Sequence, residues 1–335
     1  MARRRYILYA LGVAGFVCLV RMMRWQDAQE ILRHLEAGWL GLALLLSLAV
    51  QACKIWRWRI LLRIAGQRIS LADAVYTWMI GVFWGTVTPA RAGAFCSVAC
   101  VRRLSANTAP AGRIVSLVLI CQLLDMATIV GVGAAGIFFF PAGVVIRRIF
   151  FSVIVAGVFV MGLYWFSRGF QTRMRQALQR TELWHPFHLM VEQLRHVRQG
   201  LKGVTDPRMG QALVFHALAY GCFYLGIVCL ACAFGMSLPV GYMCFAMSAA
   251  MLVSALPVSI AGLGSRDAVL LLMLRPMGIA YEQTLLFSMI YLIIFLIVPG
   301  LAGAVIYFWR TGFEASRDPG TARGLKTAWT GEERE

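Results

Sequence analysis

The amino-acid sequence predicts an all-α polytopic membrane protein, for three reasons. Hydrophobic residues make up 60% of the chain and charged residues only 14%, against roughly 25% charged residues in soluble proteins. The apolar residues form long runs that are separated by basic residues. Two of these runs are broken by proline and glycine at corresponding places. We therefore expect about six full transmembrane helices plus two re-entrant broken helical hairpins, arranged as an inverted repeat.

The chain carries a strong excess of positive charge, with 32 Lys and Arg residues against 15 Asp and Glu residues. In a soluble protein this excess would suggest nucleic acid as a partner. Here the basic residues fall between apolar runs, where they act as topology signals and as contacts to anionic lipid headgroups. We therefore expect the lipid bilayer, and not nucleic acid, as the partner.

The nine cysteines lie mostly within apolar segments, where cysteine behaves as a small hydrophobic residue. Cys229 and Cys232 have the spacing of a metal or redox motif, but the sequence offers no second pair. We interpret both as core residues, and we expect no metal and no cofactor.

The chain begins with Met1 and Ala2, followed by three arginines and an apolar run from Tyr6 to Val20. No small-residue cleavage pattern follows this run, so we interpret it as an uncleaved first span rather than a signal peptide. Apolar residues then recur at helical spacing over residues 21–37, which favours a short helix lying in the membrane interface.

A second span is expected over residues 38–55, and its end is rich in basic and aromatic residues. Trp56 and Trp58 are typical of the headgroup level, and no acidic residue offsets the basic ones before Asp73. This pattern predicts that the end of the span faces the cytoplasm. The basic residues are Lys54, Arg57, Arg59, Arg63 and Arg68.

The next apolar region is broken in the middle. Residues 74–87 and 94–101 are apolar, and the segment Thr88–Gly93 between them contains Pro89 and Arg91. At about 1.5 Å per residue, neither apolar run crosses a hydrocarbon core about 30 Å thick. We predict a re-entrant helical hairpin that enters and leaves on the cytoplasmic side.

The rest of the chain continues this alternation of apolar and polar segments. We expect residues 1–309 to form a single integral membrane domain with both termini in the cytoplasm, because most basic residues outside the tail fall in segments assigned to that side. Small and turn-forming residues with balanced charge predict a disordered tail over 310–335. The remaining expected segments are spans at 114–140 and 149–166, a cytoplasmic amphipathic linker at 168–208, a span at 211–235, a second broken pair at 240–255 and 260–274, and a last span at 284–309.

The units 38–140 and 211–309 have nearly equal length and opposite predicted orientation. Each unit contains a proline, a following glycine, a nearby arginine and, later, a polar residue within a span. Matched segments of this kind point to a substrate site near the membrane midplane and to alternating access. The corresponding residues are Pro89 and Pro257, Gly93 and Gly262, Arg91 and Arg266, and Asp125 and Tyr291.

The residue types in the broken regions favour the binding of an anion. A half-helix that begins near Gly264 or Gly93 would point backbone N–H groups and the positive end of its dipole into the site. Arg266 and Arg91 add permanent charges that suit phosphate oxygens. The candidate substrate-binding residues are Pro89, Arg91, Gly93, Asp125, Pro257, Gly262, Gly264, Ser265, Arg266, Asp267 and Tyr291.

Two carboxylates offer an alternative for these arginines. Arg266 and Arg91 would then pair with Asp267, Asp125 or helix-end carbonyls instead of with an anion. Asp267, in the first turn after the glycines, also suits the stabilisation of a helix start. Asp125 could be a proton relay, an arginine partner or a protonated acid bonded to Gln122, and we favour the arginine partner.

Several short motifs together resemble a known family. The most specific is Pro257–Asp267, which ends in Gly-Leu-Gly-Ser-Arg-Asp, and residues 57–62, Thr88–Gly93 and 124–125 add to it. Over roughly residues 38–309 the chain resembles the transmembrane region of lysylphosphatidylglycerol synthases and the stand-alone flippase-like proteins of that superfamily. The resemblance implies a protein of the bacterial inner membrane that moves a phospholipid or a polyprenyl-linked lipid between leaflets.

The chain also departs from the family's pattern. An acidic residue commonly follows the first glycine, where Ala94 and Phe95 stand here, and an arginine commonly follows the span aspartate, where Met126 stands. In the second half Leu292 follows Tyr291. The sequence ends before any synthase domain, so we do not expect transfer of lysine from tRNA.

Two other classes of function stay open. One is an accessory subunit that presents lipid to a glycosyltransferase or synthase, and the other is an intramembrane enzyme that modifies a lipid. Catalysis would need a nucleophile or an acid–base set. His185 and His188 form the one cluster with metal-like composition, but Pro186 lies between them and we expect no metal there. We expect a transporter rather than an enzyme.

Overall fold

A computed structural model describes residues 17–88, 93–104, 111–139, 206–254 and 262–317, and this part of the chain is helical with no strand. Four of its helices are long and apolar enough to cross a membrane. They cover residues 37–64, 113–137, 208–233 and 281–310, so the chain is a multi-pass membrane protein. The expected spans at 6–20 and 149–166 and the linker at 168–208 lie almost wholly outside the described residues, as does the tail beyond 317.

The helices occur in the same order in two stretches of the chain. Each stretch has a long helix, two short helices with an interruption between them, and a second long helix. The helices are α2 (Trp25–Arg33), α3 (Ala37–Ile64), α4 (Leu71–Val87), α5 (Cys96–Leu104) and α6 (Ala111–Phe139), followed by α10 (Arg208–Ala233), α11 (Val240–Ser254), α12 (Ser265–Leu274), the short turn η3 (Arg275–Met277), α13 (Tyr281–Leu292), the π-helical turn η4 (Ile293–Ile297) and α14 (Val298–Arg317).

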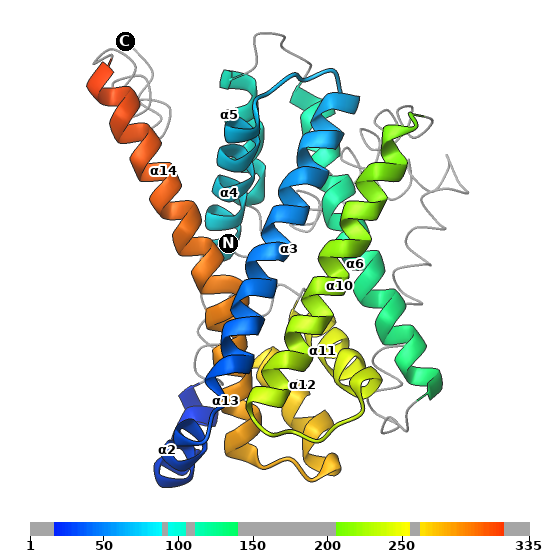
Figure 1. Ribbon diagram of the computed structural model, residues 1–335, viewed down its shortest axis with the longest axis vertical. Helices are drawn as coiled ribbons and strands as arrows, with labels where there is room; N and C mark the ends of the chain where they lie inside the picture. Colours follow the sequence, from blue (N-terminus) through cyan, green and yellow to red (C-terminus); the bar gives the residue numbers. More distant parts are fainter. Residues whose placement is uncertain (1–16, 89–92, 105–110, 140–205, 255–261, 318–335) are drawn as a thin grey trace, which may run out of the picture.

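The two long helices α3 and α10 run in opposite directions through the middle of the molecule and pack along one another (Figure 1). The short pair α4 and α5 lies at one end, and the pair α11 and α12 lies at the other. Each short pair packs on the last long helix of the other stretch: α4 contacts α14, and α11 contacts α6. The two stretches therefore pack into one another and do not form separate bundles.

The helix α3 is longer than the sequence predicts. The expected span ends at Ile55, whereas the helix continues to Ile64. Trp58, Leu61 and Leu62 are buried against α4 and α6 in one of two hydrophobic cores, so the final turns belong to the bundle. Lys54 and Arg57, which the sequence assigns to the cytoplasmic end, are consequently carried inside by the same helix.

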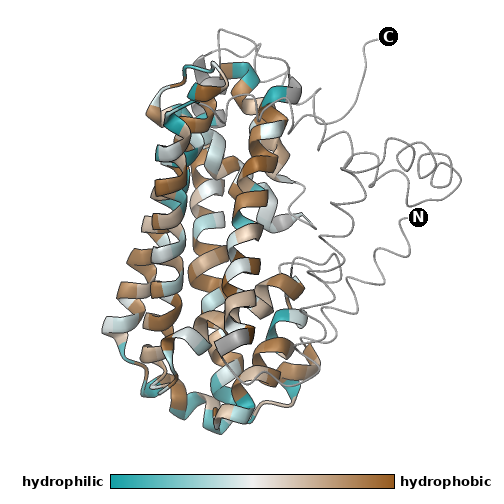
Figure 2. Cartoon of the chain, turned by 90° about the vertical axis from the view of Figure 1, so that its right-hand side faces the viewer, coloured by the Kyte–Doolittle hydropathy of each residue, from teal (hydrophilic) through white to brown (hydrophobic). Residues whose placement is uncertain are grey.

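The outer surface follows the lipid environment. Hydrophobic residues cover the length of the helices, and hydrophilic residues gather toward the two ends (Figure 2). Large exposed apolar side chains such as Leu45, Val214, Leu225 and Val305 lie on the long helices. In a bilayer these side chains meet hydrocarbon, where they are stable without a protein partner.

Glycines allow the close approach of the helices. A Cβ atom added at Gly303 of α14 would fall against the carbonyl oxygen of Met79 and 3.1 Å from the Cβ of Phe83, both on α4. A Cβ at Gly136 of α6 would fall against the ring of Phe245 on α11. Small residues at such contacts are typical of helix packing in membranes, where backbones approach one another closely.

The last span contains a π-helical turn, η4, which ends two residues before Pro299. Proline has no N–H group to donate to the carbonyls one turn earlier. Ser47 of α3 donates a hydrogen bond of 2.8 Å to the Ile294 carbonyl oxygen, which supplies a donor where proline removes one. The turn joins α13 to α14 and lies beside the central helix.

We predict that Gly303→Ala lowers the free energy of unfolding by about 1–3 kcal/mol, the usual cost of overpacking a close contact. Thermal and denaturant unfolding of the purified protein in detergent measure the change. Gly221→Ala is the matched control, because it also lies within a long helix but its new Cβ would meet no atom within 4 Å. Equal stability of the two variants would contradict the packing described for α14 and α4.

Candidate functional site: a charged cavity between the two stretches

A cavity of about 350 Å³ lies between the two hydrophobic cores. Its wall takes residues from α3, α4, α5, α6, α10 and α11, together with Arg266 of α12, Tyr291 of α13 and the turn η4. One part of the wall is aromatic, with Tyr220, Phe223, Tyr291 and Phe295. Another part is polar, with Gln51, Lys54, Gln122 and Asp125.

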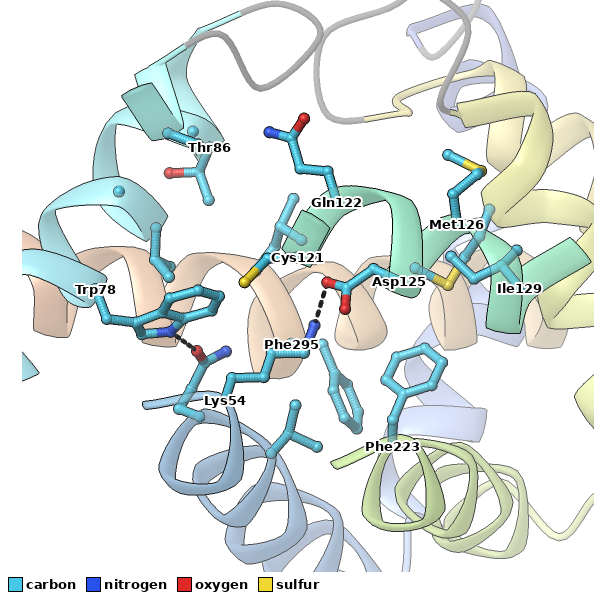
Figure 3. Close-up of a pocket in the computed structure, with 18 of the residues that line it drawn as sticks. Lys54, Trp78, Thr86, Cys121, Gln122, Asp125, Met126, Ile129, Phe223 and Phe295 are labelled. Carbon is cyan, nitrogen blue, oxygen red and sulfur yellow. Dashed lines mark hydrogen bonds and ion pairs between the residues drawn. The ribbon is translucent and has the colours of Figure 1, made fainter. Parts of the chain in front are cut away.

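Asp125 of α6 is the centre of the polar wall. Its carboxylate lies 3.0 Å from Nζ of Lys54 and 2.6 Å from Nη1 of Arg57, so one acidic side chain pairs with two basic ones from α3. Figure 3 shows Lys54 and Asp125 pointing toward one another, with Phe223 and Phe295 beside them. The favoured sequence interpretation, an arginine partner for Asp125, is confirmed, but the partner is Arg57.

His216 of α10 holds Arg57 from the other side. A guanidinium group can only donate hydrogen bonds, so its Nη1 donates to Nδ1 of His216 over 2.6 Å. The Nε2–H group of His216 then donates to the Thr128 hydroxyl over 2.7 Å, and that hydroxyl donates to the Leu124 carbonyl oxygen. This chain of donors and acceptors fixes His216 as the neutral tautomer protonated at Nε2.

Arg57 is fully buried, with 0% of its side chain exposed. Its Nε and Nη2 atoms have no hydrogen-bond partner among the described residues. Arg57 does not line the cavity. It lies behind Asp125, where it compensates the charge of the carboxylate.

A second ionic group lies at the start of α12. Arg266 donates from Nη2 to Oδ1 of Asp267 over 2.9 Å and from Nε to the Ser288 hydroxyl over 2.9 Å. Its guanidinium also lies 5.0 Å above the ring of Tyr291, where the ring face attracts a cation. The alternative in which Arg266 pairs with Asp267 is therefore the arrangement found.

Asp267 also stabilises the start of its own helix. Its Oδ2 atom accepts a hydrogen bond of 2.8 Å from the backbone N–H of Gly264. Gly262 and Gly264 both have positive φ angles, 76° and 79°, which side chains with a Cβ rarely adopt. One N–H group that the sequence assigned to an anion thus already has a carboxylate as its partner.

Gly93, at the interruption between α4 and α5, lies directly against Trp84. A Cβ at this position would fall on the Trp84 carbonyl oxygen. The Gly93 N–H donates to the Thr88 hydroxyl over 2.6 Å, and that hydroxyl donates to the Trp84 carbonyl over 2.6 Å. Thr88 and Ala94, on either side of the interruption, line the cavity.

The candidate residues from the sequence are brought together in part. Asp125, Arg266 and Tyr291 line one cavity. Gly262, Gly264, Ser265 and Asp267 form the start of α12 beside it, and Gly93 lies next to two residues of the wall. Pro89, Arg91 and Pro257 lie outside the described residues, as do His185 and His188. Within the described ranges no group of three metal-ligating side chains is close enough to hold a metal ion.

Sequence reasoning missed three residues of the site, namely Lys54, Arg57 and His216. A signal was present for the first of them. Ser47, Gln51, Lys54 and Trp58 recur at spacings of four, three and four, which places them on one face of a helix. All four are buried or line the cavity, so this face of α3 turns inward.

The charges of the site do not balance. Among the described residues that line the cavity or pair with its wall, Lys54, Arg57 and Arg266 face only two carboxylates, those of Asp125 and Asp267. Buried charges are costly in a membrane unless they are paired. Among the described residues, the site therefore holds one more cation than carboxylates.

A family model for the lysylphosphatidylglycerol synthase TM region matches residues 6–303 of the chain. A search of curated proteins found no match to the chain.

We predict that Asp125→Ala lowers the free energy of unfolding by about 3–5 kcal/mol, because it leaves the buried Arg57 without its carboxylate. Unfolding of the purified protein in detergent, followed by heat and by denaturant, measures the loss. Asp27→Ala is the control: Asp27 is half exposed and lies 3.8 Å from Arg24 on the surface, where an ion pair contributes about 0–1 kcal/mol. A loss of stability no larger than that of the control would mean that Asp125 is not the partner of a buried charge.

Proposed function

This chain belongs to the family of lysylphosphatidylglycerol synthase TM regions, and from that premise we propose that it is a lipid flippase. Its substrate is an anionic phospholipid or a polyprenyl-phosphate-linked lipid, which it moves between the leaflets of the membrane. Membership of the family supports a function connected with membrane lipids. The step from lipid to flippase is supported by the geometry of the cavity.

The observation that carries the proposal is the positively charged cavity between the two stretches of helices. Lys54 and Arg266 give it cationic groups at membrane depth, where ionisable side chains are expensive and usually functional. Its volume of about 350 Å³ lies within the range of small-molecule sites, roughly 300–1,000 Å³. A lipid headgroup fits such a space, while its acyl chains stay in the hydrocarbon outside the protein.

The arrangement of helices supports an inverted repeat and two re-entrant hairpins. The pairs α4–α5 and α11–α12 lie at opposite ends of the molecule (Figure 1). Each pair packs on a helix of the other half, because α4 contacts α14 and α11 contacts α6. Inverted halves around a central site can alternate between two equivalent openings, which is what transport between leaflets requires.

The distribution of exposed arginines supports a cytoplasmic location for one end. Arg63 lies in the last turn of α3 and Arg68 follows that helix, while Arg102, Arg103 and Arg113 lie where α5 ends and α6 begins. These helix ends meet at one end of the molecule in Figure 1. By the positive-inside rule, this end faces the cytoplasm of a bacterial inner membrane, as the sequence expects for both termini.

The proposal predicts that the protein, purified alone into liposomes, moves fluorescently labelled phosphatidylglycerol between leaflets. Dithionite quenching of the label measures the rate, and protein-free liposomes give the background. Arg266→Gln should lower the rate by about tenfold or more, because it removes the cation that pairs with the buried Asp267 at the cavity wall. Arg275→Gln should leave the rate unchanged, because Arg275 is exposed at the opposite end of the same helix.

The same preparation separates the other classes of function. An accessory subunit would move no anionic lipid by itself and would need a glycosyltransferase or synthase. An enzyme would change the mass of the lipid, which mass spectrometry of the recovered lipid detects. Equal rates for Arg266→Gln and the wild type, for every anionic lipid tested, would remove the basis of the proposal.

A further inference from the structure

We propose that Lys54 is the residue that binds the phosphate of the lipid headgroup. Its ammonium group pairs with Asp125 in the structure, and the phosphate would take the place of that carboxylate beside the ammonium. When the headgroup enters, the ammonium leaves Asp125 for a phosphate oxygen, and Arg57 keeps Asp125 compensated. This assignment rests on the proposed function and adds to it the residue and the headgroup chemistry.

Of the three cations, Lys54 is the one whose carboxylate partner, Asp125, stays paired when it leaves. Asp125 is held by Arg57 over 2.6 Å as well as by Lys54 over 3.0 Å. Departure of Lys54 therefore leaves the carboxylate with a full positive charge beside it. Removal of the sole partner from a buried charge is strongly destabilising, and the double pairing of Asp125 avoids that cost.

The two arginines are fixed by their surroundings. Arg57 is fully buried and is held between Asp125 and His216, so it does not reach the cavity. Arg266 reaches the cavity wall, but it is bound to Asp267 and to both the hydroxyl and the carbonyl oxygen of Ser288. If Arg266 left these partners, Asp267 would lose the cation that pairs with its buried carboxylate.

Lys54 has the mobility that an exchange of partners needs. Its side chain lines the cavity and is 16% exposed. A lysine ammonium is a compact charge on a flexible stem with three rotatable donors, whereas a guanidinium is a rigid fork. The ring of Tyr220 lies 5.2 Å from the Lys54 ammonium and provides an attractive surface along which the ammonium can move.

The charge balance identifies the class of headgroup. Three cations and two carboxylates leave one positive charge among the described residues of the site. A phosphodiester carries a single negative charge and no further ionisable oxygen, so it balances the one positive charge counted among the described residues. We therefore assign to this cavity a phosphodiester headgroup that has no cationic group of its own, as in phosphatidylglycerol.

Equilibrium binding tests the assignment. The full chain in phosphatidylcholine nanodiscs is titrated with dioctanoyl phosphatidylglycerol, and tryptophan fluorescence is followed because Trp58 and Trp78 line the cavity. Lys54→Gln should weaken binding by about tenfold or more, the usual effect of losing a charged hydrogen bond. Lys54→Arg should recover most of the affinity. Arg63→Gln, which removes the same charge from the exposed end of α3, should have no effect.

Two further ligands define the chemistry. Dioctanoyl phosphatidylcholine has no net charge, and it should bind weakly to both the wild type and Lys54→Gln. Inorganic phosphate should also bind weakly; affinity equal to that of phosphatidylglycerol would make the site one for free anions and would overturn the lipid assignment. The melting temperature of Lys54→Gln should stay close to that of the wild type, because Arg57 still pairs with Asp125.

The assignment of Lys54 is overturned if Lys54→Gln binds phosphatidylglycerol as tightly as the wild type, or if the wild type shows no preference for it over phosphatidylcholine. Leaflet exchange on the same variants separates this result from the proposed function. Binding that depends on Lys54 without any exchange would refute the flippase and keep the binding residue. Exchange in which neither rate nor affinity responds to Lys54→Gln would keep the flippase and refute the residue.

Discussion

The site depends on a single carboxylate, Asp125, which compensates two cations inside an apolar bundle. Charged side chains at membrane depth are stable only when they are paired or hydrated. The pairing draws α3 to α6, and the bond from Arg57 to His216 adds α10 to the same group. Three long helices are thereby held in one register by polar contacts. Apolar packing against hydrocarbon-like neighbours defines register less sharply, because it is non-directional.

A second buried ion pair lies in the other half of the fold. Arg266 and Asp267 stand in consecutive positions at the start of α12, and Ser288 of α13 bonds both of them. The two ionic groups differ in one respect that bears on chemistry. The partners of Asp267 are a single arginine, the Ser288 hydroxyl and a backbone N–H, whereas Asp125 has two cations. Of these two groups, the one around Asp125 therefore has a cation that can bind a ligand while the carboxylate stays paired.

The cavity combines these charges with an aromatic wall. Phe223 contacts both Tyr291 and Phe295, and the rings of Tyr291 and Phe295 are stacked. The aromatic group therefore bridges α10 and the end of α13 on one side of the space, while Lys54 and Asp125 form the polar side. A cavity with one apolar and one charged side matches an amphipathic ligand, whose polar and apolar parts have to be met at the same time.

The sequence by itself determined the class of protein, the two interruptions after Val87 and near Ser254, and two of the ionisable residues that line the cavity, Asp125 and Arg266. These features follow from composition and from local breaks in hydrophobic runs, which the lipid environment dictates. Only the tertiary structure decided the partners. Lys54 looked like a residue of the cytoplasmic end because charge near the end of an apolar run usually marks the interface. Its pairing with Asp125, 71 positions away, arises because α3 continues to Ile64 and turns one polar face toward α6, a contact that local periodicity cannot specify.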